Sequence, residues 1–189
     1  YIDGAGYRHT FDALGDGVSY YDTSGLGLIL SFENNYKVIS DEAGNKMYFD
    51  ALGRLEKTVS CHNEALVKKF VYNSKGQLVL VYDNRTASNQ IKFTYSSTTN
   101  LLKTMTCGYA NSENDLRTIN YTYNSNGWLT EITDEQGGAK FVYDTTNKIM
   151  KFAVSKPDNY ALKFENNTGK VTSVTQGIYD NDNMSSSNV

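Results

Sequence analysis

Three residues carry side chains suited to nucleophilic or acid–base chemistry: the two histidines, His9 and His62, and Cys61 beside the second. A cysteine–histidine nucleophile needs the thiol and the imidazole to meet in space, together with a third group that orients the imidazole. Neighbouring residues of a strand point to opposite faces of a sheet, which places Cys61 and His62 badly for this chemistry. We therefore assign no catalytic residue and predict that the chain is not an enzyme.

Metal and disulfide chemistry have little support. Asp180-Asn-Asp-Asn183 begins like a calcium loop, but Ser185 stands at the position of the loop's glycine, and no bidentate glutamate follows. Asp134-Glu-Gln-Gly-Gly138 could present carboxylates to a cation, and a charged hairpin tip explains it equally well. Cys61 and Cys107 lie 46 positions apart, and the sequence leaves open whether they pair. We predict no metal site and no cofactor.

Aromatic side chains form the remaining candidate binding surface. Four tyrosines recur at one position of a repeat: Tyr72, Tyr95, Tyr123 and Tyr143. Tyrosine offers an apolar ring face and a polar hydroxyl, so an exposed row could stack against sugar rings. Trp128, at a turn beside Gly127, is the best single candidate for a contact residue. The alternative, which we favour, is that these rings pack as cross-strand neighbours and hold a sheet together.

The repeat itself is the strongest signal in the sequence. Six segments follow the same order of residue types. An apolar residue, a variable position and an aromatic residue are followed by a small polar residue, a short turn ending in Gly or Asn, and an aliphatic residue. The segments span residues 47–55, 70–78, 93–102, 121–129, 141–149 and 162–171. Their second aromatics, separated by 20 to 28 residues, are Phe49, Tyr72, Tyr95, Tyr123, Tyr143 and Phe164. Such regular spacing indicates a repeated structural unit.

Each part of the pattern fits strands joined by tight turns. Alternate side chains of a strand share a face, so Phe70 and Tyr72 project from one side and Val71 from the other. Asp or Asn after the aromatic and Gly three positions later are typical of a turn. Asn100 and Asn147 occupy the glycine position in two segments, and asparagine tolerates left-handed backbone.

The aliphatic residues after the turn raise a question of register. Leu78 and Val81 are three positions apart, and a flat strand would place them on opposite faces. Either both faces are covered or a bulge realigns the two side chains. A second set of turn signals lies between the segments, at 41–45, 62–64, 83–85, 111–115, 134–138 and 156–159. Two turns per repeat predict two strands per repeat, in an antiparallel meander of about a dozen strands.

Composition and charge narrow the class of protein. The chain has 189 residues, a net charge of −3, and 15 Tyr and 8 Phe, which fits one β-rich domain with a real core. No basic excess supports nucleic-acid binding, and no apolar stretch approaches the ~20 residues that span a bilayer. We divide the chain into lead-in hairpins at 1–40 that cap the array, repeats at 41–176 and a flexible C-terminal tail at 177–189.

The aromatic-Asp/Asn-x-x-Gly-x-Leu pattern, clearest in Phe49–Leu55 and Tyr21–Gly25, resembles the YD or RHS repeat over roughly residues 45 to 175. Such repeats occur in bacterial secreted and wall-associated proteins, polymorphic toxins, shells of insecticidal toxin complexes and teneurin-like proteins. The resemblance implies a spiral sheet around a hollow chamber, without catalytic activity in the repeats. The family's Asp-Pro self-cleavage motif is missing, because Pro157 follows Lys156.

The sequence therefore predicts an all-β protein, an antiparallel meander of YD-repeat hairpins in an open, curved sheet too short to close a shell alone. Its predicted function is a non-catalytic scaffold or shell segment of a larger secreted or cell-surface RHS-type protein. Its predicted partners are flanking repeats and an enclosed C-terminal polypeptide. The alternative is a carbohydrate- or protein-binding module that uses Trp128 and the repeat tyrosines on a concave face. A hydrolase is disfavoured, because no nucleophile, base and orienting group can be assembled from the pattern.

Overall fold

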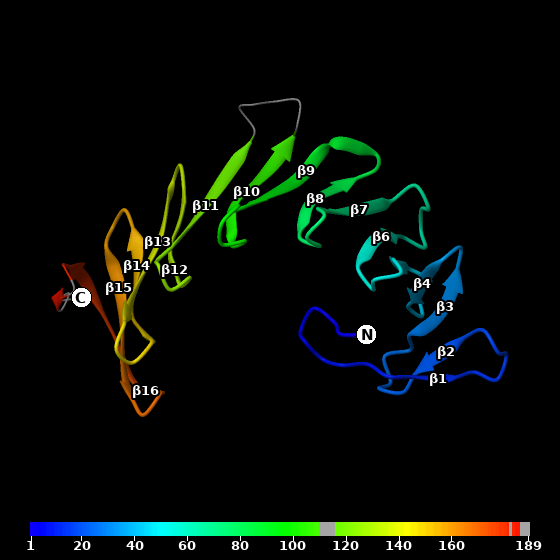
Figure 1. Ribbon diagram of the computed structural model, residues 1–189, viewed down its shortest axis with the longest axis horizontal. Helices are drawn as coiled ribbons and strands as arrows, with labels where there is room; N and C mark the ends of the chain where they lie inside the picture. The colour runs from blue at the N-terminus through cyan, green and yellow to red at the C-terminus, as the bar shows by residue number, and fades with distance from the viewer. Residues whose placement is uncertain (110–115, 182, 186–189) are drawn as a thin grey trace. The chain divides into compact units, whose positions relative to one another are not determined.

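The computed structural model describes residues 1–109, 116–181 and 183–185, and we make no statement about the side chains of residues 86–88 and 109. Within this part of the chain all regular structure is β-strand (Figure 1), and no helix long and apolar enough to span a membrane occurs there. The strands are β1 (Phe11–Ala13), β2 (Tyr20–Asp22), β3 (Ile29–Glu33), β4 (Tyr36–Ser40), β5 (Lys46–Phe49), β6 (Leu55–Val59), β7 (Val67–Tyr72), β8 (Leu78–Asp83), β9 (Thr86–Tyr95), β10 (Leu102–Tyr109), β11 (Arg117–Tyr123), β12 (Leu129–Asp134), β13 (Gly137–Asp144), β14 (Ile149–Lys156), β15 (Tyr160–Asn167), β16 (Lys170–Asp180) and β17 (Asn183–Ser185).

The sheet is an antiparallel meander, as the sequence predicts. Strands pair with the strand that follows them in the chain, from the β1–β2 pair to the β16–β17 pair. Within the described residues, no pairing joins β1 to β17, so the sheet is open. The described repeat region contains the expected dozen strands, β5 to β16, while the lead-in region adds β1 to β4 and β17 follows the repeats. The predicted turn at 111–115 lies outside the described residues.

The chain divides into two compact units and not one domain. The first contains residues 1–91 and the described residues of 108–113, and the second contains 92–107 and the described residues of 114–189. The boundary between residues 91 and 92 falls inside β9. A single-layer sheet explains the division, because each strand contacts chiefly its two neighbours. We therefore describe each unit by itself.

A β-bulge occurs at the repeat aromatic in the hairpins of both units. In the β7–β8 hairpin the register shifts between Val71 and Tyr72, so that Tyr72 pairs with Leu78 and Phe70 with Val81. Leu78 and Val81 therefore share a face although they are three positions apart, and the bulge answers the question that their spacing raised. Equivalent shifts occur at Tyr48/Phe49, Thr122/Tyr123 and Val142/Tyr143. In the last repeat the shift comes after the aromatic Phe164, between Glu165 and Asn166.

The turns use the predicted polar residue as an acceptor. Asn73 Oδ1 accepts hydrogen bonds from the backbone N–H groups of Lys75 and Gln77, at 3.0 and 2.9 Å. The glycine position is left-handed, with φ of 78° at Gly76 and 59° at Asn100. The prediction for Asn147 was wrong by one residue, because Lys148 has the positive φ of 58° there. Tyr143 pairs with Met150, seven positions on, whereas Tyr72 pairs with Leu78, six positions on. This hairpin connection is therefore one residue longer, and its left-handed residue lies one position later.

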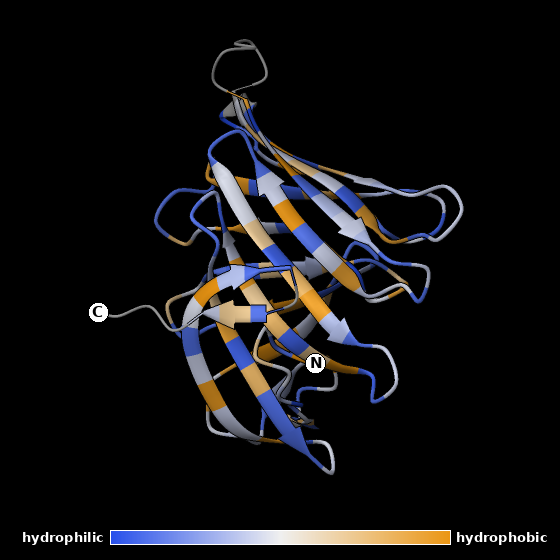
Figure 2. Cartoon of the chain, turned by 90° about the vertical axis from the view of Figure 1, so that its left-hand side faces the viewer, coloured by the Kyte–Doolittle hydropathy of each residue, from blue (hydrophilic) through white to orange (hydrophobic). Residues whose placement is uncertain are grey.

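The hydrophobic core is thinner than the composition suggested. Among the described residues, the buried apolar side chains are Leu28, Val38, Ile39, Phe152, Val154 and Ala161. Figure 2 shows apolar and polar residues alternating along many strands, as expected for a sheet with two partly exposed faces. Val38 and Ile39 are neighbours in β4 and are both buried, so both faces of the sheet are covered at that strand.

The first unit curls toward the sheet face that carries Phe49 and Tyr72, which we call its aromatic face. Tyr1 precedes β1, yet its ring centroid lies 5.9 Å from that of Phe49 in β5. Figure 1 shows β1 to β7 curving around the N-terminus, so this contact lies on the inner side of the curve. The face opposite Phe49 and Tyr72 is therefore the convex face of this unit.

The boundary at residue 177 was wrong for the described residues that follow it. β16 continues to Asp180, and β17 returns against it with Tyr179 paired to Met184. Tyr179 and Met184 pack against the buried cluster around Phe152. The polar composition of this region obscured the tyrosine and methionine that anchor it to the core.

Candidate functional site

Two of the repeat tyrosines, Tyr72 and Tyr143, each bind their hairpin to the one before it. Tyr72 of β7 donates its hydroxyl hydrogen bond to the backbone carbonyl of Leu55, the first residue of β6, at 2.8 Å. Tyr143 of β13 makes the same bond to Leu129, the first residue of β12, at 2.7 Å. Leu55 and Leu129 pair with the aromatic of their own repeat at the bulge. Each hydroxyl therefore satisfies a carbonyl where the ladder is disrupted.

The tyrosines do not form a mutually stacked ladder. Among the described residues, the Tyr143 ring contacts Trp128 and the Tyr72 ring lies under Arg54, and no ring contact joins Tyr72, Tyr123 and Tyr143 to one another. Two strands separate successive repeats, which places equivalent residues about 10 Å apart, beyond the ~4.5–7 Å of aromatic pairs. All four are half-buried, and burial raises the pKa values of Tyr72 and Tyr123. They occupy the interior of the hairpin stack.

Trp128 lies against a repeat tyrosine. Its indole ring is tilted over the Tyr143 ring with 5.2 Å between centroids, and its side chain is half-buried. Its backbone N–H donates to Asn124 Oδ1 at 3.0 Å, which fixes the turn before β12. The sequence suggested an exposed contact residue here, whereas the ring covers part of the neighbouring hairpin.

We expect Tyr143→Phe to lower the free energy of unfolding by about 0.5–1.5 kcal/mol, because it leaves the Leu129 carbonyl without this donor while keeping the ring. Tyr160→Phe is the matched control, since Tyr160 is exposed and makes no hydrogen bond through its hydroxyl in the described part of the chain. Urea unfolding measures both changes. Equal losses in the two variants would contradict a special role for the repeat hydroxyl.

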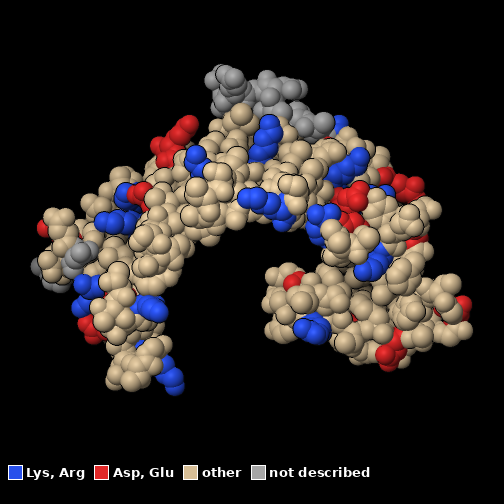
Figure 3. Space-filling model, viewed as in Figure 1, with Lys and Arg blue, Asp and Glu red and all other residues tan. Residues whose placement is uncertain are grey.

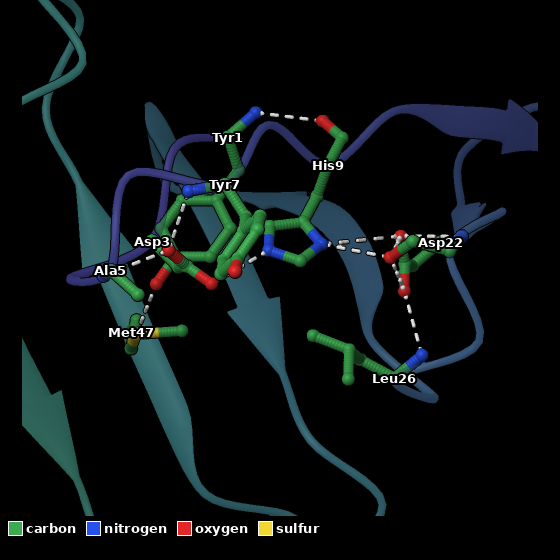
Figure 4. A network of polar contacts seen from close by, with 9 residues as sticks. Tyr1, Asp3, Ala5, Tyr7, His9, Asp22, Leu26 and Met47 are labelled. Atoms are coloured by element: carbon green, nitrogen blue, oxygen red, sulfur yellow. Dashed lines mark hydrogen bonds and ion pairs between the residues drawn. The ribbon is translucent and has the colours of Figure 1, made fainter.

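A buried polar cluster surrounds His9, which sequence analysis treated as isolated (Figure 4). The residue is 6% exposed, with Nε2 at 3.1 Å from Asp3 Oδ2 and Nδ1 at 2.8 Å from Ser24 Oγ. Asp22, also 6% exposed, accepts from the Ser24 hydroxyl at 2.7 Å and from the Leu26 N–H at 2.9 Å. The cluster fastens the segment before β1 to the turn after β2.

This cluster contains the side chains of a Ser–His–Asp triad, but its geometry favours a structural role. The Ser24 hydroxyl lies 2.7 and 2.8 Å from the two carboxylate oxygens of Asp22, so its proton is directed to a carboxylate. The Tyr1 ring stacks on the imidazole at 5.5 Å between centroids. Covered in this way, His9 has no room for a substrate beside it. The Tyr21–Gly25 turn signature was visible in the sequence, but no spacing linked it to Asp3 and His9.

We expect acid to weaken the fold through Asp22. The Ser24 hydroxyl, followed by backbone N–H groups, lowers the pKa of Asp22 below its ordinary value of 3.8. A carboxyl whose pKa is lower in the folded chain stabilises the fold above the unfolded pKa, and this contribution disappears as pH falls through the folded pKa. The melting temperature should therefore fall below about pH 4.

Asp22→Asn should melt below the wild-type chain at pH 7, and the difference should shrink as pH falls from about 4 toward 2. Circular dichroism melts across this range measure it, with the exposed Asp12→Asn as control. A difference that stays constant at all pH values would show that the Asp22 charge does not contribute.

Cys61 and His62 lie closer than the sequence argument allowed. Cys61 Sγ is 2.7 Å from His62 Nδ1, because both residues lie in the bend between β6 and β7 and not in a strand. The side chains are exposed, and His62 has no third orienting group in the described residues. Cys61 and Cys107 are both free thiols, which settles the pairing that the sequence left open.

One of the two carboxylates considered for a cation, that of Asp134, is engaged by protein groups. Asp134 forms an ion pair with Arg117 and accepts a hydrogen bond from the Gln136 N–H at 2.8 Å. Protein groups therefore satisfy the Asp134 carboxylate at this hairpin turn. In the regions that the structure describes, no group of three or more His, Cys, Asp or Glu residues is placed to hold a metal ion. Asp182 of the calcium-like segment lies outside these regions.

Comparison with known proteins relates the chain to toxin complexes through structure alone. No protein-family model matches the chain, and no curated protein is significantly similar to it in sequence. The crystal structure of TcdB2-TccC3-TEV is similar over 84% of this chain and 9% of its own, with 13% identity and a TM-score of 0.59. A Photorhabdus luminescens Tc holotoxin pore with a TccC3 mutation is similar over 85% and 10%, with 11% identity and a TM-score of 0.60.

The chain shares the fold of these toxin-complex structures. A third, TcdB2-TccC3 without its hypervariable C-terminal region, matches over 79% of this chain at 12% identity and a TM-score of 0.60. At these low sequence identities, the structural similarity establishes a common fold and does not establish a common function. The chain spans about a tenth of the length of the toxin-complex chains that it matches.

Proposed function

We propose that this chain is a non-catalytic structural segment, a piece of wall or shell in a larger secreted or cell-surface RHS-type protein. The observation that carries the proposal is the bond from a repeat tyrosine to the carbonyl at the preceding bulge, seen at Tyr72 and Tyr143. It links hairpin to hairpin, so a sheet built this way extends by adding repeats. The shared fold with segments of toxin-complex chains supports the same function.

The proposed partners follow from this architecture. An open antiparallel sheet leaves edge strands that need cover, and further repeats of the same protein would pair with them. An enclosed C-terminal polypeptide is the second proposed partner. No observation favours the carbohydrate-binding alternative, because Tyr72 and Tyr143 direct their hydroxyls to backbone carbonyls and the Trp128 ring lies tilted over Tyr143.

The full-length gene product tests the proposal. We expect electron cryo-microscopy to show these residues as consecutive hairpins of a longer wall. We also expect a C-terminal segment to resist trypsin until urea unfolds that wall. A full-length protein in which this chain stands as a separate module, with no hairpins beside it and no protected segment, would refute the shell function.

The distribution of charged side chains on the surface is compatible with the proposed structural function. Figure 3 shows acidic and basic side chains interspersed on the viewed face, without a large field of one sign. Several are ion pairs, such as Lys46 with Glu33 at 2.7 Å and Arg54 with Asp50 at 2.7 Å. Exposed pairs of this kind contribute about 0–1 kcal/mol each. A surface without a basic field offers no electrostatic footprint for nucleic acid.

A further inference from the structure

Four side chains form a row across the convex face of the first unit. Tyr48 of β5 pairs with Lys57 of β6, Lys57 pairs with Lys69 of β7, and Lys69 pairs with Tyr82 of β8. Cross-strand partners project from the same face, so this Tyr–Lys–Lys–Tyr row is continuous. It lies on the opposite side of the sheet from Phe49 and Tyr72.

The two central lysines carry charge that the chain does not neutralise. Like charges directly opposite each other in a sheet are destabilising. Within the described residues, neither Lys57 nor Lys69 has an ion-pair partner. The nearby carboxylates are engaged elsewhere on the same unit: Glu33 with Lys46 at 2.7 Å, and Glu56 with the Tyr36 hydroxyl at 2.9 Å.

Tyrosine rings hold the two ammonium groups in place. Lys57 Nζ lies 4.2 Å from the Tyr48 ring centroid and 5.4 Å from that of Tyr36. Lys69 Nζ lies 6.0 Å from the Tyr82 ring centroid. These contacts stabilise the charges, and they occupy ring faces that a sugar would need for stacking. The row is therefore suited to recognising negative charge and not a neutral carbohydrate.

Apolar residues flank the lysines on both sides. Val59 pairs with Val67 in one neighbouring row, and Val71 pairs with Leu80 in the other. Val71 is 39% exposed. The surface thus alternates apolar, basic and apolar stripes, a pattern that complements a polypeptide better than a uniformly hydrophilic glycan.

We propose that this face of β6–β8 binds an acidic polypeptide segment. Asp or Glu carboxylates of that segment pair with the ammonium groups of Lys57 and Lys69, which reach outward over Tyr48 and Tyr82. The apolar neighbours of these carboxylates lie against the valine rows. Binding removes the repulsion between two opposed cations, so charge complementarity supplies both affinity and register. The inference does not depend on the shell function, because that function uses the bonds of the aromatic face.

Fluorescence anisotropy with the whole 189-residue chain tests the proposal. The probe is a fluorescein-labelled peptide of alternating Val and Glu, and the same peptide with Gln for Glu is its neutral counterpart. We expect the acidic peptide to bind at low salt and the neutral one not to bind. Lys57→Gln combined with Lys69→Gln should weaken binding at least about tenfold.

Lys140→Gln is the matched control. Lys140 also lies over a tyrosine ring, 5.1 Å from the Tyr179 centroid, but its cross-strand partners are Glu131 and Val154, so no second lysine lies directly opposite it. The variant removes one positive charge without changing a pair of opposed cations, so peptide affinity should change less than about twofold. An equal loss in Lys140→Gln and in either single variant at Lys57 or Lys69 would overturn the proposed site.

A thermal melt separates binding from folding. The double variant removes two opposed like charges, so its melting temperature should equal or exceed that of the wild-type chain. A lower melting temperature would mean that the lysines stabilise the sheet, and would overturn the proposal. So would the absence of peptide binding at about 1 mM, or binding of heparin without binding of the acidic peptide, which would assign the row to glycans.

Discussion

Phe152→Ala should reduce the free energy of unfolding of the second unit by about 3–5 kcal/mol, the range measured for large-to-small changes at buried aromatic sites. Phe152 is 1% exposed and packs with Val154 and Ala161 in the buried cluster. The Tyr179 ring meets it edge-on at 5.3 Å between centroids. Because the core is thin, few other residues can collapse into the cavity.

The single tryptophan makes this loss directly measurable. Trp128 lies in the second unit, so its fluorescence during urea unfolding reports on that unit. Phe32→Ala is the control, since Phe32 belongs to the first unit and is 59% exposed. It should leave the tryptophan transition unchanged. A transition midpoint for Phe152→Ala equal to that of the wild-type chain would contradict the position of the core.

Gly138→Ala should cost about 3 kcal/mol through overpacking between β12 and β13. A Cβ at Gly138 would overlap the Ile132 carbonyl oxygen and lie 2.9 Å from Thr133 Cα. Both atoms are backbone of the neighbouring strand, so no change of rotamer can relieve the overlap and the two strands must separate locally.

Gly169→Ala provides the comparison within the same unit. A Cβ at Gly169 meets nothing within 4 Å, but its φ of 79° is left-handed, so alanine there should cost about 1–2 kcal/mol through backbone strain alone. Both variants can be followed by tryptophan fluorescence in urea. A larger loss for Gly169→Ala than for Gly138→Ala would show that strand spacing at β12–β13 is adjustable.

The strands and turns of each hairpin could be predicted from the sequence, because they depend on residues that are close together in the chain. The aromatic spacing located the repeats, and Asn73 with Gly76 located a turn whose hydrogen bonds involve residues two to four positions apart. The three-residue interval between Leu78 and Val81 already implied either two covered faces or a bulge. The register of β7 and β8 shows the bulge.

The candidate sites were harder to predict, because their geometry depends on long-range folding. His9 faces Ser24 because the β1–β2 pairing continues beyond the strand ends, where the Thr23 N–H donates to the Thr10 carbonyl. The Cys61–His62 argument failed because it assumed a strand where the chain bends. Trp128 seemed exposed because it stands beside a glycine at a turn, and the next repeat's Tyr143 covers it.

The sequence by itself determined that the chain is an antiparallel meander of short hairpins, since strand periodicity and turn chemistry act over a few residues. The tertiary structure alone decided what the side chains do. Successive repeats lie about 10 Å apart, so the tyrosines bond to the preceding bulge and not to one another. Strand register also placed Lys57 opposite Lys69, a pairing of residues 12 positions apart that no local pattern encodes.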